Sequence, residues 1–166
     1  MDELPPEVQT LVRRLGLSPH PEGGWYRETW RSPARVGTPR GERPAMTVIH
    51  FLLPAGDFSA FHRVHSEEAW HHVAGDPLEL RVLTPEGDHE VHRLGALHHD
   101  DARSHVVVPA GAWQAARPAG HGYSLVSCVV APGFAFEDFE MADREALVAL
   151  RPDLEAAISA LCRDPR

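Results

Sequence analysis

The sequence predicts an all-β protein, either a barrel or a pair of packed sheets, with short helices at both ends. Between about residues 25 and 130, short apolar runs recur at regular spacing and are separated by turn-forming segments such as PAGD, TPEGD and APG. Strands spaced in this way favour closed antiparallel sheets over alternating βαβ units. Helical apolar periodicity occurs only towards the two termini.

Six of the apolar runs are long enough to be predicted as strands. They span Thr47–Leu53, Ala69–Val73, Leu78–Thr84, Glu90–Leu94, Ser104–Val108 and Tyr123–Val130. The segment Arg31–Pro44 is rich in Arg, Gly and Pro, and we expect it to form a long exposed loop. The segment HHDDARSH is also interpreted as a solvated loop.

Two helical regions are predicted at the ends of the chain. Residues 5–16 place four apolar side chains on one helical face, and Gly16 is a typical helix stop. In the C-terminal tail, about 142–163, Asp143 can cap a helix that Pro152 then interrupts. We expect a single domain over 1–166, with the barrel at about 20–140.

Composition narrows the class of protein and its location. The chain has 166 residues and a formal charge of −8, so a nucleic-acid partner is not expected. Its beginning, MDELPPE, lacks the pattern of a signal peptide, and no run approaches the ~18 apolar residues of a membrane span. The two cysteines, Cys128 and Cys162, are read as free thiols, and the expected location is the cytosol without a membrane partner.

The stretch GDFSAFHRVHSEEAWHHVAG holds three side chains suited to chemistry: His62, Glu68 and His72. Strand alternation would place Glu68 and His72 on one face, and a hairpin could bring His62 opposite them. Imidazole and carboxylate groups on adjacent strands can bind a divalent metal. They can equally form a metal-free acid/base pair, in which the carboxylate fixes the imidazole tautomer. Both alternatives remain open.

The same stretch resembles the first motif of the cupin superfamily, G(x)5HxH(x)3–4E(x)6G. Gly56, His62, Glu68 and Gly75 are in register with it, while the second motif retains Pro109 and Gly111. PHPEGGWYRET, HRVHSEEAWHHVAGDPLEL, VVVPAGAWQAA and APGFAFEDFE resemble a subfamily of small single-domain cupins known as a domain of unknown function. The resemblance implies a double-stranded β-helix, a jelly-roll barrel like that of dTDP-4-dehydrorhamnose 3,5-epimerase, and a homodimer.

Two cupin metal-ligand positions are changed in this chain. Val64 and Gln114 stand where the motifs have histidine, so the resemblance leaves His62 and Glu68 of the usual set. A divalent metal, if bound, would be held by His62, Glu68, His72 and Gln114. Known metal-free cupins of the epimerase group use a His–carboxylate pair instead.

Further pocket residues are predicted from the alternation of side chains along strands and from the resemblance. Glu22, Tyr26, Trp70, Trp113 and Gln114 are candidates for the ligand pocket. For Glu22 the alternative is a solvated turn. For Trp70 the alternative is filling of the barrel core, because barrel interiors need large apolar volume.

The function expected from these residues is that of a small-molecule enzyme. It would be a sugar or sugar-acid epimerase or isomerase with His62 as acid/base, and with Glu68 and His72 orienting it or helping to hold a metal. One alternative is a non-catalytic cupin that binds a small ligand, such as a carbohydrate, as a sensor or carrier. Another is a metal-dependent dioxygenase, which would need a complete ligand set.

Overall fold

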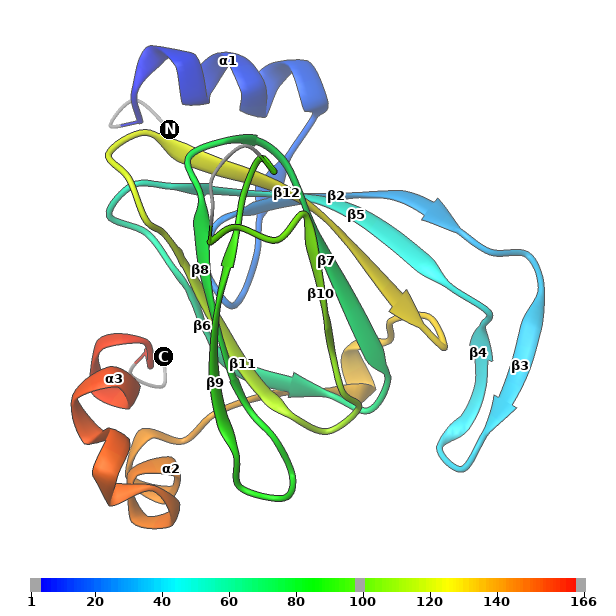
Figure 1. Ribbon diagram of the computed structural model, residues 1–166. Coiled ribbons are helices and arrows are strands. Elements are labelled where there is room, and N and C mark those ends of the chain that lie inside the picture. Colours follow the sequence, from blue (N-terminus) through cyan, green and yellow to red (C-terminus); the bar gives the residue numbers. More distant parts are fainter. Residues whose placement is uncertain (1–3, 98–100, 164–166) are drawn as a thin grey trace.

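The protein is a barrel built from two antiparallel sheets, in a computed structural model that describes residues 4–97 and 101–163 (Figure 1). His98 and His99 of the predicted histidine loop lie outside the described residues. One sheet has six strands in the order β1-β2-β5-β12-β7-β10, and the other has five in the order β13-β6-β11-β8-β9. The expected all-β jelly roll with short terminal helices is confirmed.

The strands of the larger sheet are β1 (Ser18–Pro19), β2 (Trp25–Arg31), β5 (Thr47–Pro54), β12 (Tyr123–Ala131), β7 (Glu67–Gly75) and β10 (His105–Val108). Those of the smaller sheet are β13 (Phe139–Met141), β6 (Ser59–Val64), β11 (Trp113–Pro118), β8 (Leu78–Leu83) and β9 (His89–Leu94). The helical elements are α1 (Pro6–Leu15), η1 (Phe136–Asp138), α2 (Arg144–Leu150), η2 (Pro152–Leu154) and α3 (Glu155–Ala160).

The six predicted strands all form, with ends that differ by at most two residues. The predicted loop over Arg31–Pro44 is wrong, because this segment forms a two-stranded hairpin of β3 (Arg35–Thr38) and β4 (Gly41–Pro44). Gly41, at φ 107°, supplies the backbone conformation that the turn requires. The hairpin projects away from the barrel, so it lacks the alternating apolar face that would reveal a strand (Figure 1).

The terminal helices cover the outer faces of the two sheets. Val8 and Val12 of α1 pack on Leu52 and Leu125 of the larger sheet. The C-terminal helices pack Leu147 and Ile158, among others, against the smaller sheet. Asp143 caps α2 as predicted, its carboxylate accepting a hydrogen bond of 2.8 Å from the Ala146 amide. None of the helices among the described residues is long and apolar enough to cross a membrane.

The barrel interior is divided along its axis. A large cluster of buried side chains, including Phe51, Trp70, Leu80 and Val108, fills the space between the sheets at one end. Past this cluster, towards Glu68 and His62, the sheets enclose a cavity instead. The packed end therefore forms a rigid base for whatever binds in the cavity.

Candidate active site

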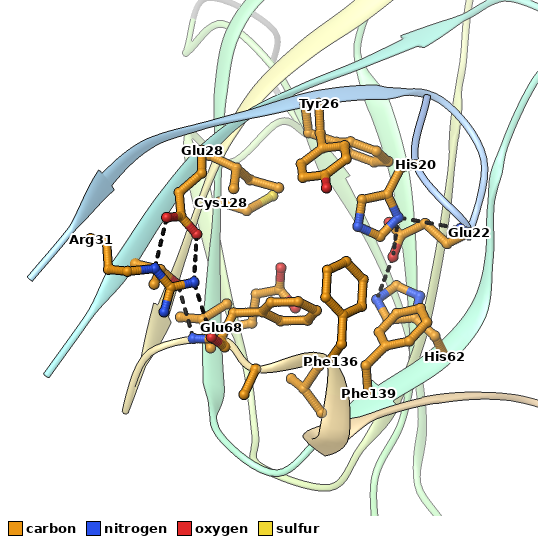
Figure 2. A pocket seen from close by; sticks show the side chains of 17 residues that line it. His20, Glu22, Tyr26, Glu28, Arg31, His62, Glu68, Cys128, Phe136 and Phe139 are labelled. Atoms are coloured by element: carbon orange, nitrogen blue, oxygen red, sulfur yellow. Dashed lines mark hydrogen bonds and ion pairs between the residues drawn. The ribbon is translucent and has the colours of Figure 1, made fainter. Parts of the chain in front are cut away.

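The cavity has a volume of about 350 Å³ and is lined from both sheets (Figure 2). Its polar lining comes from His20, Glu22, Tyr26, Glu28, Arg31, Thr47, His62, Glu68 and Cys128. Its apolar lining comes from Ile49, Phe51, Val64, Val130, Phe134, Ala135, Phe136 and Phe139. A mainly apolar cavity with a few convergent polar groups is typical of a small-molecule site.

Strand alternation explains most of this lining. Tyr26 and Glu28 share one face of β2, and Cys128 and Val130 share one face of β12, because side chains two residues apart point the same way. Glu22 instead lies in the turn before β2. That turn contains Gly23 at φ 110°, where a Cβ atom would clash with the Phe58 carbonyl.

The carboxyl group of Glu22 lies at the centre of a buried polar cluster. Its Oε1 accepts a hydrogen bond of 2.7 Å from the Ser59 hydroxyl. Its Oε2 lies 3.3 Å from Nε2 of His62 and 3.5 Å from Nδ1 of His20. The residue is only 6% exposed, so its charge state is determined by these partners rather than by solvent.

The hydrogen bonds of the two imidazoles define where protons lie. His62 Nδ1 is 2.8 Å from the Ala60 carbonyl, so it must carry a proton and donate it. His20 Nδ1 accepts a bond of 3.2 Å from the Glu22 amide, so it carries a lone pair. If both rings are neutral, the two nitrogens that face Glu22 Oε2, which are His62 Nε2 and His20 Nδ1, are hydrogen-bond acceptors. Because an acceptor at 3.3 Å from a carboxyl oxygen needs a proton between them, we infer that Glu22 and His62 share one proton.

Burial favours the neutral form of this pair. It raises the pKa of Glu22 to about 8, although the Ser59 hydroxyl and the Arg163 charge act in the opposite direction. Burial also lowers the pKa of His62. At neutral pH the shared proton therefore resides mainly on Glu22, which donates it to His62 Nε2.

Glu68 reaches the same cavity from β7 of the larger sheet, whereas His62 lies on β6 of the smaller one. Its Oε2 accepts a short bond of 2.6 Å from the amide of Gln114, whose oxygen accepts 2.8 Å from the indole of Trp70. Because indole only donates, this chain fixes the Gln114 amide with its NH₂ group towards Glu68. Burial raises the pKa of Glu68 to about 7, with the His62 charge opposing the shift.

Four of the predicted site residues line the cavity: Glu22, Tyr26, His62 and Glu68. The predicted hairpin pairing of His62 with Glu68 is wrong, because β6 and β7 belong to different sheets. The two side chains meet by closure of the barrel rather than across adjacent strands.

The expectation that His72 shares the cavity is also wrong. The alternation of side chains along a strand determines which face of the sheet each one lies on, but not how far along the barrel it lies. Four residues of strand separate Glu68 from His72 by about 13 Å. Trp70 fills the interval between them. His72 instead places Nε2 3.1 Å from the Asp76 carbonyl.

Three further pocket candidates do not line the cavity. Trp70 is 1% exposed and belongs to the barrel core, which confirms the alternative given for it. Gln114 is fully buried behind Glu68 and acts on the cavity only through that carboxyl group. Trp113 faces the C-terminal helices, with the Arg63 guanidinium 4.5 Å above its ring.

The donor set does not fit a cupin metal. Val64 has no lone pair to offer, and the Gln114 oxygen is already bonded to the Trp70 indole. His72 lies outside the cavity. Among residues 4–97 and 101–163, no group of three or more His, Cys, Asp or Glu side chains is arranged to hold a metal ion.

Sequence reasoning did not identify His20, Cys128 or the aromatic rim as cavity residues. His20 is two residues from Glu22 in PHPEGGWYRET, and this spacing is the sequence feature that could have indicated His20 as a cavity residue. Cys128 lies on the same face of β12 as Val130, which is two residues further along the strand. The rim residues Phe134, Phe136 and Phe139 form edge-to-face contacts with one another, at centroid distances of 5.0 to 6.3 Å.

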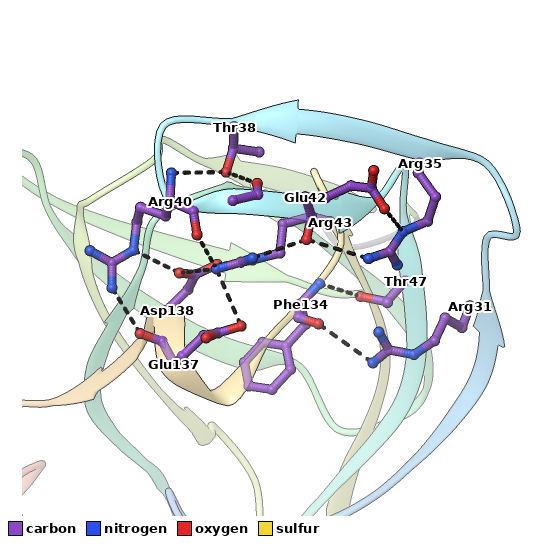
Figure 3. A network of polar contacts seen from close by, with 11 residues as sticks. Arg31, Arg35, Thr38, Arg40, Glu42, Arg43, Thr47, Phe134, Glu137 and Asp138 are labelled. Carbon is purple, nitrogen blue, oxygen red and sulfur yellow. Dashed lines mark hydrogen bonds and ion pairs between the residues drawn. The ribbon is translucent and has the colours of Figure 1, made fainter.

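An ion-pair network fixes this rim to the projecting hairpin (Figure 3). Asp138, next to Phe139, accepts bonds of 2.7 and 3.0 Å from the Arg43 guanidinium and one of 2.7 Å from Arg40. Hydrogen bonds from the two arginines lower the pKa of Asp138 to about 2. The hairpin thus holds the aromatic rim in place over the cavity.

Replacing Asp138 by Asn is expected to destabilise the protein at pH 7 by about 1–2 kcal/mol, less than for a fully buried pair because solvent screens the half-exposed Arg40. A depressed carboxyl pKa stabilises the fold above about pH 4, and this contribution is lost as pH falls towards 2. Urea unfolding at pH 7 and pH 3 should therefore give a smaller difference at pH 3. Glu137→Gln, at a 70% exposed neighbour, is the control, and an equal loss there would contradict the assignment.

Comparisons with known proteins agree with this fold and site. The model of the family "Cupin superfamily (DUF985)" matches residues 9–142. An uncharacterized protein of Saccharomyces cerevisiae, YML079W, is 29% identical over 155 residues, covering 83% of this chain and 76% of its own length.

Solved structures are similar over nearly the whole chain. A hypothetical protein from Leishmania major is 35% identical with a TM-score of 0.87, covering 94% of this chain and 98% of its own. Protein SO0799 from Shewanella oneidensis is 36% identical with a TM-score of 0.87, covering 95% and 98%. Oxalate decarboxylase from Bacillus subtilis, at 15% identity and a TM-score of 0.55 over 86% of this chain and 36% of its own, is similar in fold alone. The chain therefore belongs to the cupin superfamily, in its DUF985 family.

Proposed function

We propose that this cupin is a small-molecule epimerase or isomerase that moves a proton on a carbon atom next to a carbonyl group. The observation that carries the proposal is the contact of 3.3 Å between Glu22 Oε2 and His62 Nε2, with the Glu68 carboxyl group in the same cavity. The candidate substrates are keto sugars and sugar acids small enough for a cavity of about 350 Å³.

The acid strengths suit proton transfer near neutral pH. An acid or base works best when its pKa lies near the working pH. The pKa of Glu22 is raised to about 8 and that of Glu68 to about 7, in each case chiefly by burial. Both carboxyl groups can thus exchange protons with a carbon acid without being fixed in one form.

Epimerisation needs two proton carriers, and Glu22 and Glu68 enter the cavity from different segments, the turn before β2 and strand β7 (Figure 2). In the ion-pair form, the Glu22 carboxylate takes a proton from the substrate carbon while His62 remains protonated. The C–H electron pair moves into the enolate. Glu68 then gives its proton to the opposite face of that carbon and becomes a carboxylate. Return of one proton from the Glu22–His62 pair to Glu68 through solvent restores the starting state.

The runner-up is a ligand-binding cupin without catalysis. Val64 and Gln114, which stand where the motifs have metal-binding histidines, favour it, because this chain lacks two of the usual cupin ligands. A dioxygenase lacks support for the same reason.

The testing experiment is hydrogen exchange in D₂O. The protein is incubated with a panel of keto sugars and sugar acids, and loss of the α-proton signal is followed by NMR. We expect one panel member to exchange, and His62→Gln to lower its rate by at least about a hundredfold. His72→Gln is the matched control, since this histidine lies outside the cavity, and it should retain the rate. Binding without exchange in the unmodified protein would favour the runner-up.

Homodimer formation, implied by the resemblance, forms a second part of the proposal. Val107, Ala69, Val129, Val48 and Trp30 lie in register across the larger sheet, on the face away from the cavity. Val107 and Trp30 are 54% and 53% exposed. We expect a second copy of the chain to cover this apolar row. Light scattering, which measures the mass in solution, should therefore find a dimer for the unmodified protein and a lower mass for Val107→Glu.

A further inference from the structure

We propose that His20 and Tyr26 form an oxyanion-binding subsite in the cavity, which takes the carbonyl or enolate oxygen of a small planar carbonyl compound. The proposal deepens the proton-transfer function above and rests on it for the substrate class. It assigns to His20 a role as a neutral hydrogen-bond donor, rather than as an acid, a base or a metal ligand.

The tautomer of His20 follows from one backbone contact. The Glu22 amide donates to His20 Nδ1 at 3.2 Å, so Nδ1 carries the lone pair. A neutral imidazole has one N–H group, and it must therefore be at Nε2. The same turn is closed by bonds of 3.0 Å from the His20 amide to the Gly24 carbonyl and from the Gly23 amide to the His20 carbonyl. The tautomer is thus fixed by the loop itself.

Nε2 and the Tyr26 hydroxyl point into the cavity (Figure 2). Within the described part of the chain, neither group has a hydrogen-bond partner. The side chain of His20 is only 7% exposed, yet neither donor atom is among the fully buried atoms that lack a partner, so both are open to the cavity. Two neighbouring donors that are unpaired and open to the cavity are placed to bind a ligand oxygen.

The rings hold these donors in a fixed relation. The centroids of His20 and Tyr26 are 4.5 Å apart and their planes make an angle of 81°. Phe51 and Phe139 also contact the imidazole edge-to-face, at 5.8 and 5.9 Å. Preorganised donors stabilise developing charge strongly, because they need not reorient during the reaction.

The imidazole also stays uncharged over the working range of pH. Burial, assisted by the charge of His62, lowers the pKa of His20 to about 3. A neutral donor can bind an enolate oxygen without transferring a proton to it. It also avoids placing a positive charge beside His62, which would oppose proton uptake by the Glu22–His62 pair.

The position of the subsite suits the chemistry proposed above. Glu22 follows His20 by two residues, so the base and the donors belong to one turn and the start of one strand. A carbonyl oxygen bonded to His20 and Tyr26 would place its α-carbon beside the Glu22 carboxyl group. The subsite therefore selects ligands with a planar oxygen and an adjacent C–H group.

The test uses glycolohydroxamate, a planar mimic of an enediolate, and 1,2-propanediol, which has no planar oxygen. In the unmodified protein, ¹⁵N NMR of the histidine rings should find His20 as the Nε2–H tautomer from pH 5 to 8. Glycolohydroxamate should shift that signal, whereas 1,2-propanediol should not. An Nδ1–H tautomer or an imidazolium at pH 7 would overturn the proposal.

Binding of the same probe tests the two donors separately. Tyr26→Phe and His20→Leu should each weaken glycolohydroxamate binding about tenfold, the size expected for one lost hydrogen bond. His20→Gln, which keeps an N–H donor near the Nε2 position, should recover most of the affinity. Affinity unchanged in both Tyr26→Phe and His20→Leu would refute the subsite.

Glu22→Gln separates this proposal from the proposed function. It should bind glycolohydroxamate as tightly as the unmodified protein, because both donors remain, yet catalyse no proton exchange. If the unmodified protein exchanges no proton but binds the probe through His20 and Tyr26, the enzymatic function fails and the oxyanion subsite stands. The NMR tautomer measurement keeps the test decisive even if His20→Leu fails to fold.

Discussion

Glu22→Gln is expected to make the protein more stable at alkaline pH while abolishing proton transfer. The pKa of Glu22 is about 8 in the folded protein, against an ordinary value of 4.5. Between these pH values the unfolded chain releases a proton that the folded protein keeps. Stability conferred by the neutral carboxyl group therefore falls as pH rises through this window. A glutamine has no proton to release, so the variant escapes this loss.

The expected gain follows from the size of the pKa shift. The variant and the unmodified protein should share the same pH dependence below about pH 4.5 and diverge by roughly 4 kcal/mol at pH 8. The glutamine can reproduce the contacts of the protonated acid, since its oxygen can accept from Ser59 and its NH₂ group can donate to His62. A new clash or an orphaned donor is therefore not expected.

Urea unfolding at pH 5, 7 and 8.5 measures this divergence. Glu140→Gln is the control, because Glu140 is an exposed partner of Arg63 and its carboxylate is solvated in both states. We expect its difference in unfolding free energy to stay small and constant above pH 5. A difference for Glu22→Gln that does not grow with pH would show that Glu22 is ionised in the folded protein, and the shared-proton arrangement would be wrong.

The sequence predicts the barrel better than it predicts the depth of the site. Strand alternation correctly places Glu68 on an inward face, because the pattern of period two is set by burial. The same alternation places His72 on that face too, but it holds no information on distance along the barrel. The bulk of Trp70, which separates the two, becomes decisive only once the sheets close.

The partner of His62 could not be assigned from local spacing for a related reason. Glu68 is six residues away in the chain, whereas Glu22 is forty residues away and approaches through a glycine turn. The approach depends on Gly23 lying against the Phe58 carbonyl, which is a tertiary contact. The motif PHPEGGWYRET contains the residues of the site, but only closure of the barrel brings them to His62.

Restoring the two missing histidines is expected to create a metal site that this chain lacks. Gln114 is the register partner of His62 across β6 and β11, and Val64 lies two residues along β6, lining the cavity. Val64→His/Gln114→His would therefore present three imidazoles and the Glu68 carboxylate to one point. We expect Ni²⁺ or Zn²⁺ affinity to rise by at least about a hundredfold, since each added ligand should contribute more than an outer-shell contact does.

Calorimetric titration of proteins prepared without a histidine tag measures this gain. Val64→His alone is the matched control and should give a smaller increase. The double variant also deprives the Trp70 indole of its acceptor, so a stability loss of about 1–3 kcal/mol should accompany the new site. Equally weak binding by both proteins would contradict the designed site, whereas equally tight binding would mean that His62 and Glu68 of the unmodified protein already bind a metal by another route. In that second case the metal-free proton transfer proposed for Glu22 and His62 would have to be abandoned.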